Sequence, residues 1–335
     1  MKLFGSPGSP FARKVRIVLA EKHIPCEYVI ARGSAPDSPV PPFNPLAVAL
    51  GFAENLVGRS HECDFPSDVL RLPQLTASKL QKGLRSAEID KRVQEIVSQG
   101  LSVYEVDAEQ LRALRPDVIL TQAQCAVCAV TPDDLESALQ EWSGNAPRLL
   151  SLAPDTLADV WGDILRVAAA LDAIPTGERV VEALEARLGT LRAKTAGRPR
   201  PSVAAIEWTE PLMAAGNWIP ELIEAAGGRA LFAEPGQHSP WLAWETLAAA
   251  DPDIIVLMPC GYRIAETLAE LESFDRCAAW QNLTAVGKGR VFVTDGHHFF
   301  NRPGPRLVES AEILAEIFGT SHFGHEGTGW LRPTA

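Results

Sequence analysis

Short apolar runs alternate with amphipathic stretches along most of this chain, a pattern typical of an α/β fold built on parallel strands. Five of these runs have strand character, and each is followed at once by a cluster of His, Cys, Trp or Asp. The pairs are NLVGRS with His61, DVILTQ with Cys125, SVAAI with Glu207, DIIVLMP with Cys260, and RVFVT with Asp295. In open α/β sheets, ligands bind beyond the carboxyl ends of the strands. The five clusters therefore predict a ligand site.

Helical periodicity separates these runs. Helices are predicted at about 86–99, 108–114 and 305–318. A longer helical region extends over about 155–196, where apolar residues recur at helical spacing. The sequence Pro175-Thr176-Gly177 is expected to divide this region into two helices.

Proline- and glycine-rich stretches mark the boundaries between folding units. Residues 33–45 read as a linker, and TAGRPRP at 195–201 begins a second α/β lobe. The predicted organisation is an N-terminal fragment with its linker at 1–45, a first lobe at 46–153, a bridging helical region at 154–197, a second lobe at 198–319 and a tail at 320–335.

Composition and charge exclude some classes of partner but say little about the fold. A chain of 335 residues, 46% hydrophobic and 22% charged, is typical of a globular protein with more than one folding unit. The net charge of −11 argues against nucleic acid as a partner. No apolar run reaches the roughly 18 residues of a membrane-spanning helix.

The N-terminal residues indicate in which cell compartment the protein is expected. Arg13, Lys14 and Arg16 interrupt the apolar residues near the N-terminus, and no A-x-A-like cleavage site follows a long apolar stretch. This is not the layout of a secretory signal. A cytoplasmic location is expected for the sequence as written, and a periplasmic one if the native start differs.

The first 45 residues have a pattern of their own. Strands at 2–5 and 26–30 are predicted to flank a helix at about 10–22, with Ser9 as its cap. The sequence LFGSPGSPFARKVRIVLAEKHIPCEYV resembles the start of the glutathione transferase N-terminal domain, a partial thioredoxin-like segment. In that family a serine at this position stabilises the glutathione thiolate, so the resemblance implies a glutathione contact for Ser9.

A second resemblance extends almost continuously over residues 46–319. Its sequence stretches include VGRSHECDFP, LRPDVILTQAQCAVCAV, EPLMAAGNWIPELIEAAGG, HSPWLAWETLAAADPDIIVLMPCG and FNRPGPRLVESAEILAEIF. This part resembles the cobalamin-binding proteins of the periplasmic-binding-protein superfamily. The resemblance implies two Rossmann-like lobes joined by a single long helix, with the ligand in the cleft between them. It also implies a carrier without catalysis that binds a corrinoid and serves an ABC-type permease.

A corrinoid is a broad, flat macrocycle around cobalt, and aromatic side chains bury such a ring at low entropic cost. Trp208 and Trp241 are the predicted aromatic contacts, and the resemblance favours Trp241 in particular. Trp218 and Trp244 are more typical of a core. The other predicted ligand contacts are Tyr104, Glu207, Cys260, His297 and Arg302. For the last three, a role in the core, the rim or a turn remains open.

His61, Cys63, Cys125 and Cys128 bring imidazole and thiol groups to two strand ends of the first lobe. Both groups suit zinc, iron or cobalt. Three interpretations stay open: buried packing, a set that faces or ligates the corrinoid cobalt, and a small structural or transferable metal site. As a hypothesis, His61 or one of the thiols supplies an axial ligand to the cobalt.

In related transport proteins, one acidic residue at the tip of each lobe docks onto arginines of the permease. The resemblance assigns these roles to Glu105 and Glu245, which also fit ordinary solvated carboxylates. Two other functions stay open: a glutathione-dependent transferase or corrinoid-processing enzyme that uses the N-terminal segment, and an iron-siderophore or haem binder. No set of nucleophile, base and orienting group is evident, so a binding protein is predicted.

Overall fold

The computed structural model divides the chain into two compact units, Met1–Pro41 and Pro42–Ala335. It describes residues 2–5, 27–30, 46–81, 83–99, 102–123, 135, 142, 146–274 and 277–333. In the first unit the strands predicted at 2–5 and 26–30 are present as β1 (Lys2–Gly5) and β2 (Glu27–Ile30), which pair in parallel. Ser9 and the helix predicted at 10–22 lie outside the described residues.

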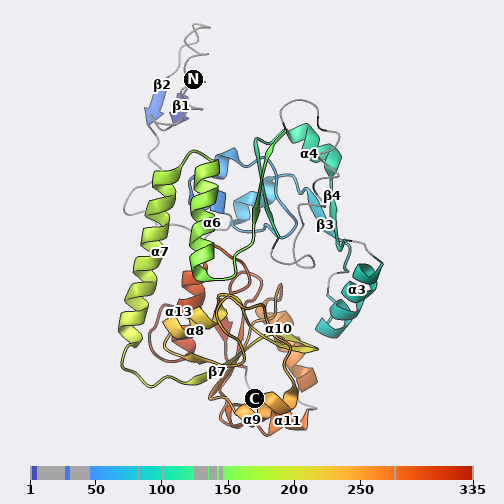
Figure 1. Cartoon of the computed structure of the whole chain (residues 1–335), viewed down its shortest axis with the longest axis vertical. Coiled ribbons are helices and arrows are strands. Elements are labelled where there is room, and N and C mark those ends of the chain that lie inside the picture. Colours follow the sequence, from blue (N-terminus) through green and yellow to red (C-terminus); the bar gives the residue numbers. More distant parts are fainter. Residues whose placement is uncertain are drawn as a thin grey trace. The chain divides into compact units, whose positions relative to one another are not determined.

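The C-terminal half of the second unit, residues 202–331, is built on a mixed sheet (Figure 1). Its strands are β7 (Ser202–Thr209), β8 (Leu212–Ala214), β9 (Arg229–Ala230), β10 (Ile254–Leu257), β11 (Val291–Thr294) and β12 (Trp330–Leu331). The strand order is β12-β11-β10-β7-β8, and β9 also pairs with β7. β7, β9, β10 and β11 are parallel, and β8 and β12 are antiparallel edge strands.

Helices cover both faces of this sheet, which is why its central strands are continuous apolar runs. Val203, Ile254 and Val256 pack toward α8 (Ile219–Ala225) and α13 (Leu307–Ile317). Alternate residues such as Ile206 and Ile255 pack toward the other face. That face is covered by α9 (Trp244–Ala250), α10 (Ile264–Phe274), α11 (Ala278–Gln281) and α12 (Thr284–Gly287).

The N-terminal half, residues 46–152, has smaller sheets among its described residues. β3 (Thr76–Ser78) and β4 (Tyr104–Val106) are antiparallel, and β5 (Val118–Gln122) and β6 (Arg148–Leu152) are parallel. The helical elements are α2 (Leu46–Ala49), η1 (Ala53–Asn55), η2 (Ser67–Arg71), α3 (Ser86–Ser98) and α4 (Ala108–Leu114). The Asp107 side chain caps α4 by accepting from the Gln110 amide at 2.9 Å.

The prediction of a strand in NLVGRS, residues 55–60, is wrong. Residues 55–60 form only an isolated bridge between Arg59 and Gln74. Arg59 N donates to Pro73 O and Leu75 N donates to Arg59 O, but Pro73 has no N–H to extend the ladder. Backbone pairing in this segment is therefore limited to the single bridge, and the His61 amide donates to Thr76 Oγ1 at 2.9 Å just beyond it.

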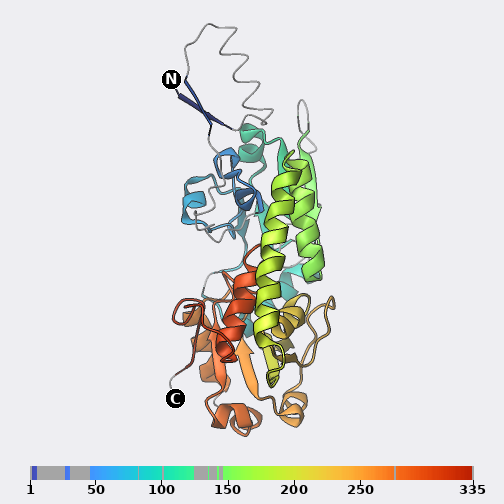
Figure 2. The same cartoon turned by 90° about the vertical axis from the view of Figure 1, so that its left-hand side faces the viewer.

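The bridging region consists of α6 (Leu157–Ala170) and α7 (Ile174–Thr195), which lie side by side (Figures 1 and 2). The break falls at residues 171–173, where Asp172 has φ of 55°, and not at the predicted Pro175-Thr176-Gly177. Pro175 instead lies in the first turn of α7, where a missing N–H costs nothing. A Cβ on Gly177 would lie 2.5 Å from Ala168 Cβ, so this glycine allows the close approach of the two helices.

This helix pair carries one continuous apolar core from the N-terminal half to the C-terminal half. α6 packs against α2 and β6, and α7 packs against α8 and α13. The buried residues of this cluster extend from Leu46 and Leu150 through Ile164 and Leu188 to Val203. No helix of the described segments combines the length and the apolarity needed to cross a lipid bilayer.

A buried polar contact also joins the halves. Glu270 of α10, only 4% exposed, accepts from Ser86 Oγ at 2.6 Å and from Thr209 Oγ1 at 2.8 Å. Arg85 is the N-cap residue of α3, and its amide donates to Glu88 Oε2 at 2.9 Å. The Ser86 hydroxyl is thereby used to anchor the start of α3 to the C-terminal half.

Glu316 of α13 holds the C-terminal segment. Its buried carboxylate accepts from Trp330 Nε1 at 2.8 Å and from the His325 amide at 3.0 Å. It also accepts from the amides of Phe323 and Gly324. Burial raises the pKa of Glu316, but the hydrogen bonds from Trp330 and the three amides outweigh it and lower the pKa below its usual value.

We expect Glu316→Gln to lower the free energy of unfolding at pH 7 by about 2 kcal/mol, because several buried donors lose a charged acceptor. Since the folded-state pKa is lowered, the stabilisation is complete above the unfolded pKa of about 4.3 and is lost as the pH falls through the folded value. The gap to wild type should therefore narrow below about pH 4, as measured by urea unfolding.

The control is Glu185→Gln on the exposed side of α7, which should change stability by no more than about 0.5 kcal/mol. A gap for Glu316→Gln that stays constant between pH 7 and pH 3 would contradict the role of its carboxylate.

Candidate functional site

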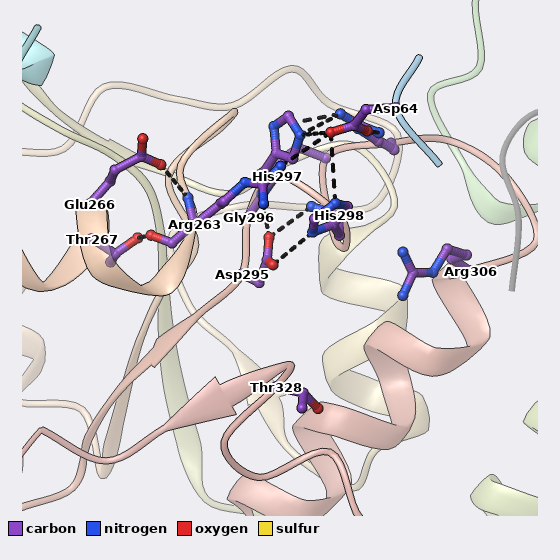
Figure 3. A network of polar contacts seen from close by, with 12 residues as sticks. Asp64, Arg263, Glu266, Thr267, Asp295, Gly296, His297, His298, Arg306 and Thr328 are labelled. Atoms are coloured by element: carbon purple, nitrogen blue, oxygen red, sulfur yellow. Dashed lines mark hydrogen bonds and ion pairs between the residues drawn. The ribbon is translucent and has the colours of Figure 1, made fainter. Parts of the chain in front are cut away.

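The carboxylate of Asp64 joins the N-terminal half to basic side chains of the C-terminal half (Figure 3). His297 Nε2 lies 2.6 Å from Asp64 Oδ2, and Arg302 Nη1 donates to Asp64 Oδ1 at 2.8 Å. Arg263 Nη2 donates to Asp64 Oδ2 at 3.3 Å. Burial raises the pKa of Asp64, but the hydrogen bonds from His297 and Arg302 prevail and hold it well below its usual range. Asp64 is therefore an anion at neutral pH.

Asp295, directly after β11, orients the two histidines that follow it. Its Oδ1 accepts from the amides of His297 at 3.0 Å and His298 at 2.8 Å, and its Oδ2 lies 2.8 Å from His298 Nδ1. A Cβ on Gly296 would lie 2.2 Å from Pro259 O, so only glycine allows this loop to pack against the end of β10. Burial raises the pKa of Asp295, but the hydrogen bonds with His298 outweigh burial and lower the pKa below its usual value.

Arg306, at the start of α13, is stacked between two aromatic rings. Its guanidinium lies 4.2 Å from the Phe65 ring centroid and 4.0 Å from that of Phe299, and it pairs with Glu309 at 3.2 Å. Phe65 therefore packs onto the C-terminal half next to Asp64. A small pocket remains here, lined by Phe65, His298, Arg302, Gly304, Pro305 and Arg306.

Among the first-lobe residues predicted as ligand contacts or metal ligands, His61 and Tyr104 lie side by side. His61 Nδ1 lies 2.7 Å from Thr76 Oγ1, and the His61 ring centroid is 5.3 Å from that of Tyr104. Burial raises the pKa of the Cys63 thiol to about 11, so Cys63 is protonated at neutral pH. The packing, corrinoid-facing and metal-site interpretations of Cys63 all stay predictions. Cys125 and Cys128 lie outside the described residues.

A different group of metal-ligating atoms meets in the described part of the chain. Asp64, His297 and His298 each offer one ligand atom within 4.8 Å of the others. Of the predicted set of His61, Cys63, Cys125 and Cys128, only His61 and Cys63 are described, and neither belongs to this group, so the predicted set stays a prediction. Asp64 and the two histidines belong to the polar clusters HECD (61–64) and DGHH (295–298), so the sequence did mark their neighbourhood. Residue type alone favours His61 and Cys63 over Asp64 as metal ligands, and for this reason sequence reasoning missed the group.

The predicted contacts at the end of β7 are held by neighbouring loops. β7 continues to Thr209, so Glu207 and Trp208 lie within the strand and not after it. Ser239 Oγ donates to Glu207 Oε2 at 2.8 Å, and the Cys260 amide donates to Glu207 O at 3.2 Å. Glu207 and Cys260 are therefore neighbours at the ends of adjacent strands.

The tryptophans divide into surface and core. Trp241 is 61% exposed, and the half-buried Trp208 stacks edge-on with Tyr262 at 5.6 Å between ring centroids. Trp218 is 3% exposed and donates to a backbone carbonyl, and Trp244 packs against two aromatic rings. The core interpretation for Trp218 and Trp244 fits these positions.

The two acidic residues predicted to dock onto a permease are exposed. Glu105 lies in the middle of β4, and Glu245 lies in the first turn of α9.

Arg263, which contacts Asp64, carries no signal in the sequence that would have marked it as part of a site. Only the structure shows that the loop between β10 and α10 brings the Arg263 guanidinium to Asp64.

Comparison with known proteins identifies the family. The family model of the periplasmic binding proteins matches residues 46–297. The model of the glutathione S-transferase N-terminal domain matches residues 3–48, a similarity of that segment alone. No curated protein sequence matches the chain.

Three solved structures illustrate the shared fold. A periplasmic heme binding protein from Pseudomonas aeruginosa is 20% identical with a TM-score of 0.62, covering 83% of this chain and 90% of that one. The periplasmic vitamin B12 binding protein BtuF of Vibrio cholerae is 18% identical with a TM-score of 0.58, covering 82% and 92%. An ABC-type Fe³⁺-hydroxamate transport system from Saccharomonospora viridis DSM 43017 is 19% identical with a TM-score of 0.56, covering 82% and 89%. At these identities the likeness shows the fold, and the match of the family model over residues 46–297 shows that the chain belongs to the periplasmic binding protein family.

Proposed function

We propose that this chain is a carrier that binds a corrinoid in a cleft between its N-terminal and C-terminal halves, which act as two lobes joined by α7. The observation that carries the proposal is the position of residues 61–66 against the carboxyl ends of β10 and β11. Asp64 contacts His297 and Arg302 there, and Phe65 packs on Arg306. This is where an α/β sheet binds its ligands.

The contacts of Asp64 are of the kind that a ligand can replace. They are made by side chains that are partly exposed, whereas the apolar contacts of α7 with α8 and α13 belong to the core. Opening of the cleft would therefore break the Asp64 contacts and leave α7 in place. The imidazole of His297 and the guanidinium of Arg302 would then be available to the amide or phosphate groups of a corrinoid.

The aromatic side chains support a flat ligand. Trp241 exposes 61% of its surface, which is unusual for so large an apolar group. Near the end of β7, the half-buried Trp208 offers a second ring, which packs edge-on against the buried Tyr262. Such rings bury a macrocycle through its faces and edges. Among the first-lobe residues, His61 is the candidate axial ligand to cobalt.

A haem or ferric siderophore is the second candidate. Two arginines and two histidines around Asp64 suit a ligand with carboxylates, such as haem. Proteins of this fold bind heme and vitamin B12, according to the names of the solved structures. Delivery to an ABC-type permease, with Glu105 and Glu245 as docking residues, is part of the same proposal.

Hydroxocobalamin should produce a saturable 1:1 absorbance change when titrated into the full chain in the presence of EDTA. Trp241→Ala should weaken this binding about tenfold or more, because truncating an aromatic anchor costs about 2 kcal/mol. Phe323→Ala is the control, since it removes an exposed aromatic ring from the C-terminal segment. Hemin and a ferric hydroxamate serve as parallel titrants, and a response to them alone would reject the corrinoid.

His61→Ala should change the visible absorption spectrum of bound aquocobalamin, because the spectrum reports the atom in the axial position. The matched control is His238→Ala, which removes an exposed imidazole of the C-terminal half. Identical spectra for wild type and both variants would show that His61 is not an axial ligand.

A further inference from the structure

Three metal-ligating side chains meet where residues 61–66 cover the end of β11. Asp64 Oδ2 lies 2.6 Å from His297 Nε2 and 3.8 Å from His298 Nε2. The two imidazole rings stand nearly perpendicular, with centroids 4.8 Å apart. The side chains are 16–19% exposed, so solvent reaches the group, but each side chain is largely enclosed. Figure 3 shows the three residues converging from two loops.

The surrounding contacts orient two of the three side chains as metal ligands require. Asp295 Oδ2 lies 2.8 Å from His298 Nδ1, so this nitrogen carries the hydrogen and His298 Nε2 presents its lone pair. Arg302 Nη1 holds Asp64 Oδ1 at 2.8 Å and leaves Oδ2 toward the histidines. A carboxylate behind a ligating histidine and a hydrogen bond to a ligating carboxylate are the usual second layer of a metal site.

The charges around the group decide what can bind. Glu62, Asp64 and Asp295 supply three negative charges, and Arg263 and Arg302 supply two positive ones. Arg263 occupies the same oxygen that a cation would use, at 3.3 Å, but its side chain is 56% exposed and can turn into solvent. Arg302 Nη2, 3.0 Å from His297 Nε2, would also move, while its Nη1 keeps Asp64 Oδ1.

We infer that Asp64, His297 and His298 form a binding site for a divalent transition-metal cation of the Zn²⁺ or Co²⁺ class. Two imidazoles and one carboxylate suit these ions and leave one position open, whereas Mg²⁺ and Ca²⁺ prefer oxygen ligands. Asp64 belongs to the N-terminal half and the histidines to the C-terminal half, so the bound cation links the two. This site involves free metal ions and does not depend on the proposed corrinoid ligand.

The test is a titration of the full chain, freed of metal with EDTA and desalted, with Co²⁺ followed by visible absorbance and with Zn²⁺ followed by calorimetry. We expect one cation per chain and a rise in the unfolding temperature with Zn²⁺ but not with Mg²⁺. His298→Ala should abolish this binding. Asp295→Asn, which keeps the side chain's shape, should weaken it about 10- to 100-fold.

Arg263→Gln should tighten binding several-fold, because it removes the positive charge that competes for Asp64 Oδ2. A role of these residues in folding alone would not produce this gain. His238→Ala is the control for imidazoles at the surface and should leave the affinity unchanged.

Absence of Co²⁺ and Zn²⁺ binding at millimolar concentration would overturn the inference. So would binding that survives His298→Ala and disappears after alkylation of the thiols, because the cation would then be held by cysteine. Since no corrinoid is present in this titration, and EDTA is present in the corrinoid titration, each of the two proposals can fail without the other.

Discussion

A charged carboxylate within the fold is stable only where hydrogen bonds and opposite charges replace its water. In the part of the chain that the structure describes, Asp64 meets this constraint with side chains of the other half. His297, Arg302 and Arg263 surround it. Satisfying Asp64 draws residues 61–66 onto the carboxyl ends of β10 and β11. The stacking of Phe65 on Arg306, the small pocket beside them and the meeting of Asp64 with two histidines all follow from that placement.

The two halves are also joined by the apolar core of α6 and α7 and by the hydrogen bonds of Glu270, and both are more deeply buried than the contacts of Asp64. The apolar core of α6 and α7 is continuous from β6 to β7, so it cannot open without exposing buried surface. Glu270, with Ser86 and Thr209, is almost fully buried. The contacts of Asp64 are the most exposed of the three, and local opening requires the least free energy where contacts are most exposed.

Sequence reasoning succeeded where local pattern and burial agree. β5, β10 and β11 are apolar runs that form strands as predicted, and α4 and α13 begin and end close to their predicted limits. It failed at residues 55–60, because Pro73 on the opposing segment cannot donate to a ladder. It also misplaced the break before α7, because a proline in a first helical turn looks like a breaker in sequence.

The sequence by itself determined the family, the buried strands and the polar clusters that follow most of them, because these depend on local periodicity and composition. Only the tertiary structure decided which members of the clusters meet. Asp64 and His297 are 233 positions apart, and no local pattern records that separation. Their contact depends on β11 ending beneath residues 61–66, on the missing Cβ of Gly296 and on Asp295 turning both histidines toward the N-terminal half. For the same reason, only the structure could bring a carboxylate and two imidazoles together, whereas the set of His61, Cys63, Cys125 and Cys128 stays a prediction.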